Sequence, residues 1–169
     1  LSHSSAASDV YKRQILSRKI EIVKNLSKLT DKENVLSEAD ELRPYETDAL
    51  SVYTQTPLAV VLPENTGEVS EILKYCYSEN IKVVPRGAGT GLSGGALPLQ
   101  DAILLGLGKF NKILEIDYKN KCVVTQPGVT NLGITHAVQH KGFYYAPDPS
   151  SQLASVSYTH LTLPTSVTV

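Results

Sequence analysis

The 169-residue sequence predicts an α+β fold, in which a β-α-β subdomain is followed by the start of a second α+β subdomain. Two observations support this prediction. Short apolar runs at residues 58–62 and 81–84 flank a segment with helical periodicity. Three further strand candidates, at residues 102–107, 113–116 and 122–125, then precede a second helical segment.

The N-terminal part is expected to be helical and then irregular. Apolar residues recur at helical spacing over residues 15–29, which predicts an amphipathic helix whose apolar face carries Leu16, Ile20, Val23 and Leu26. Residues 35–39 predict a shorter helix or a turn. Residues 42–48 are expected to be irregular because Pro44 disfavours helical backbone at the residue before it.

The β-α-β unit is predicted over residues 58–84. Asn65 and Glu68 form an N-terminal capping pattern at the start of its helix. Five apolar residues then recur at the spacing of one buried helix face: Val69, Ile72, Leu73, Cys76 and Tyr77. We expect the two flanking strands to be parallel and their crossover to be right-handed.

The second subdomain is predicted to begin with strands and continue into a helix. The polar run at residues 117–121 predicts a turn between the last two strands. Pro127 and Gly128 interrupt the chain, Thr130 or Asn131 caps the helix that follows, and Gly142 ends it.

The composition of the chain indicates which partners and which cellular compartment to expect. The net charge of −1 gives no indication of a nucleic-acid or anionic-membrane partner. Cys76 and Cys122 lie within apolar patterns and are expected to be reduced core residues, with a single disulfide as the alternative. No apolar run approaches the ~18 residues of a membrane helix, and no signal peptide is recognisable at the start of the sequence.

The two ends differ in character from the rest of the chain. Residues 1–14 and 155–169 resemble strings that recur at the ends of unrelated metagenomic translations, and we expect both to be non-native tails. The remaining chain divides into an N-terminal helical segment, residues 15–53, and an incomplete ligand-binding domain, residues 54–154.

A glycine-rich stretch provides the main functional signal. Five glycines fall within residues 87–95, which we call the glycine loop, directly after the strand at residues 81–84. Glycine reaches positive φ without strain, so successive backbone N–H groups can turn toward one anion. Arg86 could add a charged fork suited to phosphate. The sequence therefore predicts a diphosphate site for a nucleotide cofactor.

Other motifs are less complete. Gly89, Gly91 and Gly94 match the dinucleotide fingerprint G-x-G-x-x-G, but that fingerprint opens a helix, and Gly95 and Pro98 leave no room for one. The Lys-Ser or Lys-Thr of a P-loop is missing as well.

No catalytic or metal centre is recognisable. Ser93 lacks the spacing of a serine nucleophile motif. His136 and His140 stand four apart on a predicted helix without a third ligand, so we expect surface histidines and no metal site.

The glycine loop and its surroundings resemble a known flavoprotein family. Residues 85–98 resemble the first FAD-diphosphate loop of the vanillyl-alcohol-oxidase/PCMH superfamily, nearest to the FAD-binding subunit of glycolate oxidase and to the D-lactate dehydrogenases. Residues 42–48, 126–129 and 144–152 resemble further motifs of that subunit in the same order. The resemblance covers about residues 18–154 and implies an FAD-binding PCMH-type domain.

The resemblance implies a set of cofactor-binding residues. The covalently flavinylated branches carry a histidine where this loop has Thr90, which implies non-covalent FAD. The residues implied to bind FAD are Pro85, Arg86, Gly87, Ala88, Gly89, Thr90, Gly91, Leu92, Ser93, Gly94, Gln126, Gly128, Val129, Pro147, Asp148, Ser150 and Ser151.

The implied activity is hydride transfer from a small 2-hydroxy acid, glycolate or D-lactate, to the flavin. Beyond Ala154 the family continues into a substrate domain that this sequence does not contain, so the catalytic residues are unknown and the fragment is expected to be inactive alone. The resemblance leaves open partner subunits, including an iron–sulfur subunit, and peripheral attachment of a cytoplasmic protein to the inner membrane through them. Alternatives are a non-catalytic FAD-binding electron-transfer domain and another PCMH-type oxidoreductase.

Overall fold

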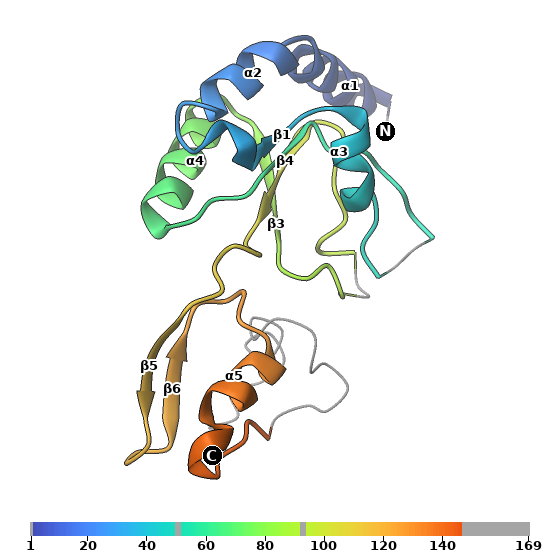
Figure 1. Cartoon of the computed structure of the whole chain (residues 1–169). Helices are drawn as coiled ribbons and strands as arrows, with labels where there is room; N and C mark the ends of the chain where they lie inside the picture. The colour runs from blue at the N-terminus through green and yellow to red at the C-terminus, as the bar shows by residue number, and fades with distance from the viewer. Residues whose placement is uncertain (1, 50–51, 92–93, 147–169) are drawn as a thin grey trace. The chain divides into compact units, whose positions relative to one another are not determined.

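The structure, a computed structural model, describes residues 2–49, 52–91 and 94–146 (Figure 1). The chain divides into two compact units, residues 1–106 and residues 107–169, and each is described by itself. The mixed helices and strands confirm the predicted α+β class.

Unit 1 is built on a four-stranded sheet with the order β1-β2-β4-β3. Its strands are β1 Val35–Leu36, β2 Ala59–Val61, β3 Lys82–Arg86 and β4 Ala102–Gly106. Strands β2 and β3 are each parallel to β4, so the parallel strands of the β-α-β unit are confirmed, but β4 lies between them. Strand β1 pairs with β2 in the antiparallel direction. The carboxyl ends of these three parallel strands therefore lie at the same end of the sheet, and the glycine loop begins there, directly after β3.

The core of unit 1 lies on both faces of β2 and β4. Every residue of these two strands is buried. Leu42 packs against Val60 and Leu104 on one face. Figure 1 shows α3, Ala39–Leu42, and α4, Thr66–Ser78, on opposite sides of the sheet. The sheet is thus covered on both faces, as parallel strands require.

Helix α4 begins as the sequence predicts, but its buried face is narrower. The Asn65 side chain accepts a hydrogen bond from the Glu68 backbone N–H at 3.0 Å, which confirms the cap. Ile72 and Cys76 are buried, whereas Leu73 is 43% exposed and Tyr77 is 88% exposed, so their predicted burial is wrong.

The buried side of α4 is shared with a second helix. The Asn25 side-chain amide donates to the Tyr75 hydroxyl at 3.3 Å, and Arg18 forms an ion pair with Glu79. These contacts place the N-terminal helical segment beside Tyr75 of α4 and its C-cap residue Glu79, which lie on a different side of the helix from Leu73 and Tyr77. A periodicity count cannot locate such a neighbour.

The predicted helix over residues 15–29 is two helices. Helix α1 spans Ser2–Ser17 and α2 spans Lys19–Leu26. The buried side chains are Ile15, Ile22 and Leu26, while Ile20 on the predicted apolar face is 87% exposed. Residues 2–14 are helical, and their non-native origin stays a prediction.

Residues 35–39 do not form the predicted helix or turn. Val35–Leu36 is strand β1, because its backbone pairs with Val60 and Val61 of β2. The Leu62 amide also donates to the Asn34 carbonyl at 2.9 Å, which extends this pairing. Helix α3 starts only afterwards, at Ala39.

Unit 2 consists of a hairpin and a helix. Strands β5, Ile113–Asp117, and β6, Cys122–Thr125, are antiparallel and joined by the predicted turn. Helix α5, Asn131–Val138, is capped by the Thr130 hydroxyl, which accepts from the Gly133 N–H at 3.0 Å. Gly142 ends the helical segment with φ 80°. Short 3-10 helices complete the structure at Lys32–Asn34, Arg43–Tyr45 and Gln139–Lys141.

The cysteine prediction is half correct. Cys76 is buried on α4, but Cys122 is exposed at the start of β6, so its predicted core position is wrong. Both thiols are free. None of the helices in the described ranges combines the length and the apolar character needed to cross a membrane.

Candidate cofactor-binding site

The glycine loop leaves the carboxyl end of β3 without forming a helix. Gly89 and Gly94 have φ 73° and 74°, a region that favours glycine. Over residues 87–91 and 94–101, the described part of the connection to β4, the backbone forms turns and bends and no helix. This geometry does not match the strand–glycine–helix arrangement of a Rossmann dinucleotide site.

Two glycines of the loop face open space. A Cβ atom added at Gly91 or at Gly95 would meet no atom of the described residues within 4 Å, and neither residue has positive φ. Among the described residues, neither internal packing nor backbone conformation therefore requires glycine at these positions. Close approach of a ligand to the backbone is a further reason for glycine. An elongated anion such as a diphosphate could accept hydrogen bonds from the backbone N–H groups of a loop of this kind.

Arg86 turns toward the N-terminal segment. Its Nη1 donates to the Tyr45 carbonyl at 3.2 Å, and its guanidinium carbon lies 5.8 Å from the centre of the Tyr45 ring. Partial burial lowers the pKa of Arg86, and the negative charge of Asp48 opposes this shift. The guanidinium predicted to hold phosphate is therefore in contact with Tyr45, which belongs to the motif at residues 42–48, for which the sequence predicts no role.

The glycine loop is also bonded directly to the same segment. The Ala49 backbone N–H donates to the Gly89 carbonyl at 2.9 Å. The glycine loop and the segment around residues 45–49, about forty residues apart in the sequence, are thus in contact at the carboxyl end of β3. Thr90 lies in the described part of the loop, whereas Leu92 and Ser93 lie outside the described residues.

The motif at residues 126–129 forms a tight turn in unit 2. The Gln126 side-chain carbonyl accepts from the Lys112 N–H at 2.9 Å. The Gly128 N–H donates to the Phe110 carbonyl at 2.6 Å, and the Val129 side chain is 5% exposed. The side chains of Gln126 and Val129 are thus engaged inside unit 2, and their contact with a cofactor stays a prediction.

The last motif begins at the described end of unit 2. The Tyr145 N–H donates to the Thr135 hydroxyl at 3.1 Å, which fixes the start of this segment beside α5. Four predicted cofactor-binding residues follow it and lie outside the described residues: Pro147, Asp148, Ser150 and Ser151.

The two helix histidines are exposed, as predicted. His136 and His140 lie at the surface of unit 2, and the His140 ring meets Tyr118 edge-on with 6.4 Å between ring centres. Within the described ranges, no three His, Cys, Asp or Glu side chains lie together in a way that could hold a metal ion.

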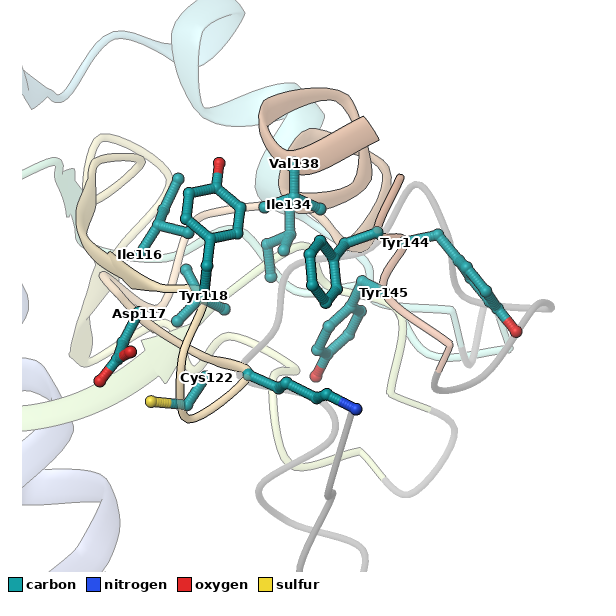
Figure 2. Close-up of a pocket in the computed structure, with 11 residues that line it drawn as sticks. Ile116, Asp117, Tyr118, Cys122, Ile134, Val138, Tyr144 and Tyr145 are labelled. Carbon is teal, nitrogen blue, oxygen red and sulfur yellow. The ribbon is translucent and has the colours of Figure 1, made fainter. Parts of the chain in front are cut away.

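A small cavity lies in unit 2 between α5 and the hairpin. Figure 2 shows Ile134 and Val138 of α5 on one side of it and Ile116 and Tyr118 on the other. Its volume is about 40 Å³, little more than the roughly 30 Å³ that one water molecule occupies in the liquid. A cavity of this volume is too small for a flavin ring.

Comparisons with known proteins show which proteins the chain resembles. The chain is 50% identical over 120 residues to the glycolate oxidase subunit GlcD of Escherichia coli K12, covering 71% of this chain and 24% of that protein. It is 36% identical over 110 residues to a D-lactate dehydrogenase of Anaerostipes hadrus, covering 64% and 23%. The chain therefore spans about a quarter of the length of these curated relatives.

A solved structure of a flavoprotein resembles this chain as well. The structure of p-cresol methylhydroxylase with substrate bound superposes with a TM-score of 0.63 at 30% identity, over 72% of this chain and 24% of that one. This likeness confirms the predicted PCMH-type fold. The family model described as "FAD binding domain" matches residues 57–157, and the chain belongs to this family of FAD-binding proteins.

Proposed function

We propose that this chain is the N-terminal FAD-binding part of an FAD-dependent dehydrogenase that oxidises a small 2-hydroxy acid such as glycolate or D-lactate. The observation that carries the proposal is the glycine loop itself, in which Gly89 and Gly94 take positive φ and Gly91 and Gly95 have no described atom within 4 Å of an added Cβ. The names of the relatives support the substrate class, since glycolate oxidase and D-lactate dehydrogenase are among them.

The role of this chain is to bind and orient. Backbone N–H groups of residues 87–94 would hold the diphosphate of FAD, and Thr90, in place of a histidine, leaves the flavin non-covalent. When bound, FAD supplies an acceptor for the hydride of the substrate. The motifs at residues 126–129 and 147–151 would contact the cofactor from unit 2. The residues that bind the substrate and move its proton belong to the remaining part of the longer protein.

The wider setting is part of the same proposal. The relation to GlcD supports a place in a glycolate oxidase assembly with further subunits, one of which would carry an iron–sulfur cluster. We propose a cytoplasmic enzyme that reaches the inner membrane through such subunits.

Bound flavin in the full-length protein that contains this chain provides the test. Flavin released by acid precipitation measures non-covalent FAD, and anaerobic bleaching by glycolate or D-lactate measures hydride transfer. Gly91→Ala places a methyl group where the ligand would lie, so we expect FAD affinity to fall about tenfold, as for roughly one lost hydrogen bond.

Gly108→Ala is the matched control, because a Cβ there also meets nothing within 4 Å but lies outside the glycine loop. This variant should keep its FAD. Equal FAD affinity in the two variants would contradict the diphosphate site. Bound FAD that neither acid bleaches would favour the electron-transfer domain instead of the dehydrogenase.

A further inference from the structure

Arg86 lies between the glycine loop and the N-terminal segment. Its Nη1 donates to the Tyr45 carbonyl at 3.2 Å, and the guanidinium lies near the Tyr45 ring, 5.8 Å from its centre. Four residues after Tyr45, the Ala49 N–H donates to the Gly89 carbonyl at 2.9 Å. Residues 45–49 therefore contact both the arginine and the loop.

The arginine also packs against the backbone of the loop. A Cβ atom added at Gly89 would lie 2.6 Å from Nε of Arg86 and 2.7 Å from its Cζ. The guanidinium thus occupies the volume that any side chain at position 89 would take. Gly89 has φ 73°, in the left-handed region, so the loop takes this conformation at the residue that packs against the arginine.

A buried acid lies in the same segment. Asp48 is 6% exposed and directly precedes Ala49, whose N–H donates to the Gly89 carbonyl. The negative charge of Asp48 acts on the Arg86 guanidinium, and a buried carboxylate is costly unless a positive group compensates it. The charge of Asp48 therefore favours a guanidinium that stays beside residues 45–49.

We propose that Tyr45, Asp48 and Arg86 form a clamp that positions the backbone of Gly89, and through it the N–H groups that receive the FAD diphosphate. In this clamp Arg86 and Asp48 are positioning residues and not ligands of the phosphates. The inference rests on the proposed function, because the clamp acts on the loop that would bind FAD.

The effect of removing the Asp48 charge has opposite signs in the two possible roles of Arg86. If Arg86 bound the diphosphate directly, Asp48 would compete with the phosphates, and Asp48→Asn would tighten FAD binding. Removing any nearby negative charge favours an anionic ligand for the same reason. In the clamp, Asp48→Asn releases the arginine and lets the loop move, so FAD binding weakens.

The experiment titrates full-length apoprotein with FAD and with riboflavin, which lacks the diphosphate. We expect Asp48→Asn and Arg86→Lys each to weaken FAD binding about tenfold, roughly the effect of losing one hydrogen bond between the loop and the diphosphate. Riboflavin affinity should stay unchanged, because it does not use the loop. The double variant should lose no more than the stronger single variant, since both changes open one clamp.

Matched controls come from the same segment. Asp40→Asn and Arg43→Lys make the same chemical changes at exposed residues and should leave FAD affinity as in the wild type. Equal losses in these controls would overturn the clamp. Tighter FAD binding by Asp48→Asn would also overturn it and would make Arg86 a direct phosphate ligand.

Hydrogen exchange gives a second measurement without any flavin. The Ala49 amide, bonded to the Gly89 carbonyl, should exchange about tenfold faster in apo Arg86→Lys than in wild type, because local opening becomes easier. Unchanged exchange there would overturn the clamp even if Asp48→Asn failed to fold. Wild-type apoprotein that binds no FAD would instead refute the proposed function, and the exchange comparison would still decide the clamp.

Discussion

Gly128 offers the sharpest test of packing in unit 2. A Cβ atom added there would lie 2.6 Å from the Phe110 carbonyl oxygen and 2.8 Å from that of Leu107, both backbone atoms. An ordinary contact needs about 0.6–0.8 Å more, because ordinary van der Waals contact of a Cβ atom begins at 3.4 Å. Gly128→Ala must therefore push the turn away from residues 107–110.

The cost can be worked from these contacts. The shift breaks the bond from the Gly128 N–H to Phe110, which is worth about 1 kcal/mol, and overpacking adds about 1–3 kcal/mol. Alanine also restricts the unfolded chain more than glycine does, which stabilises the folded state by about 0.4–1 kcal/mol. The net loss in the free energy of local opening is about 1–3 kcal/mol by this reckoning.

Hydrogen exchange of the full-length protein measures this loss. The Gln126 amide, which donates to the Lys112 carbonyl at 2.9 Å, reports on the turn that Gly128 closes. Gly108→Ala is the control, because its Cβ meets no atom within 4 Å, and it should be neutral or slightly protective. Equal exchange at Gln126 in the two variants would refute the packing argument.

Three further predictions concern the loop, the thiols and the hairpin turn. Gly89→Val should abolish flavin retention in the full-length protein, because φ 73° strains a branched residue; bound FAD at the wild-type level would contradict this. Burial raises the pKa of the Cys76 thiol to about 11, so a thiol reagent at about pH 8 should label Cys122, whose side chain is exposed, and not Cys76; equal labelling of the native protein would contradict the fold. Hydrogen bonds from Asn120 lower the pKa of Asp117 below 3.8, so the carboxylate stabilises the turn above that pH and this stabilisation is lost as the pH falls. The difference in thermal midpoint between wild type and Asp117→Ala should shrink from about pH 6 to about pH 3, and a constant difference would count against the turn.

Local signals in the sequence predicted much of the fold. The Asn65 cap, the turn that begins at Asp117 and the Thr130 cap all depend on contacts within a few residues, and the structure has each of them. The glycine loop was recognisable for the same reason, since its density of glycines exceeds what a turn requires. The resemblance to the flavoprotein family rested on motifs spread along the chain, and the family match confirms it.

Long-range contacts explain what the sequence could not predict. The exposure of Leu73 and Tyr77 depends on which helices pack beside α4, and Arg86 turns inward because a segment some forty residues earlier supplies its partners. No spacing rule contains such information. The short strand Val35–Leu36 is likewise defined by its pairing with β2 and not by its own residues.

The central position of β4 has a consequence for synthesis of the protein. Strands β2 and β3 both take β4 as their parallel partner, so that pairing cannot begin until residues 102–106 have left the ribosome. Translation proceeds at about 5–20 residues per second. While the glycine loop is being synthesised, the apolar segment Ala59–Val61 still lacks its parallel partner β4. A pause at this point would expose an aggregation-prone nascent chain. The time needed to translate the glycine loop therefore affects the yield of folded protein.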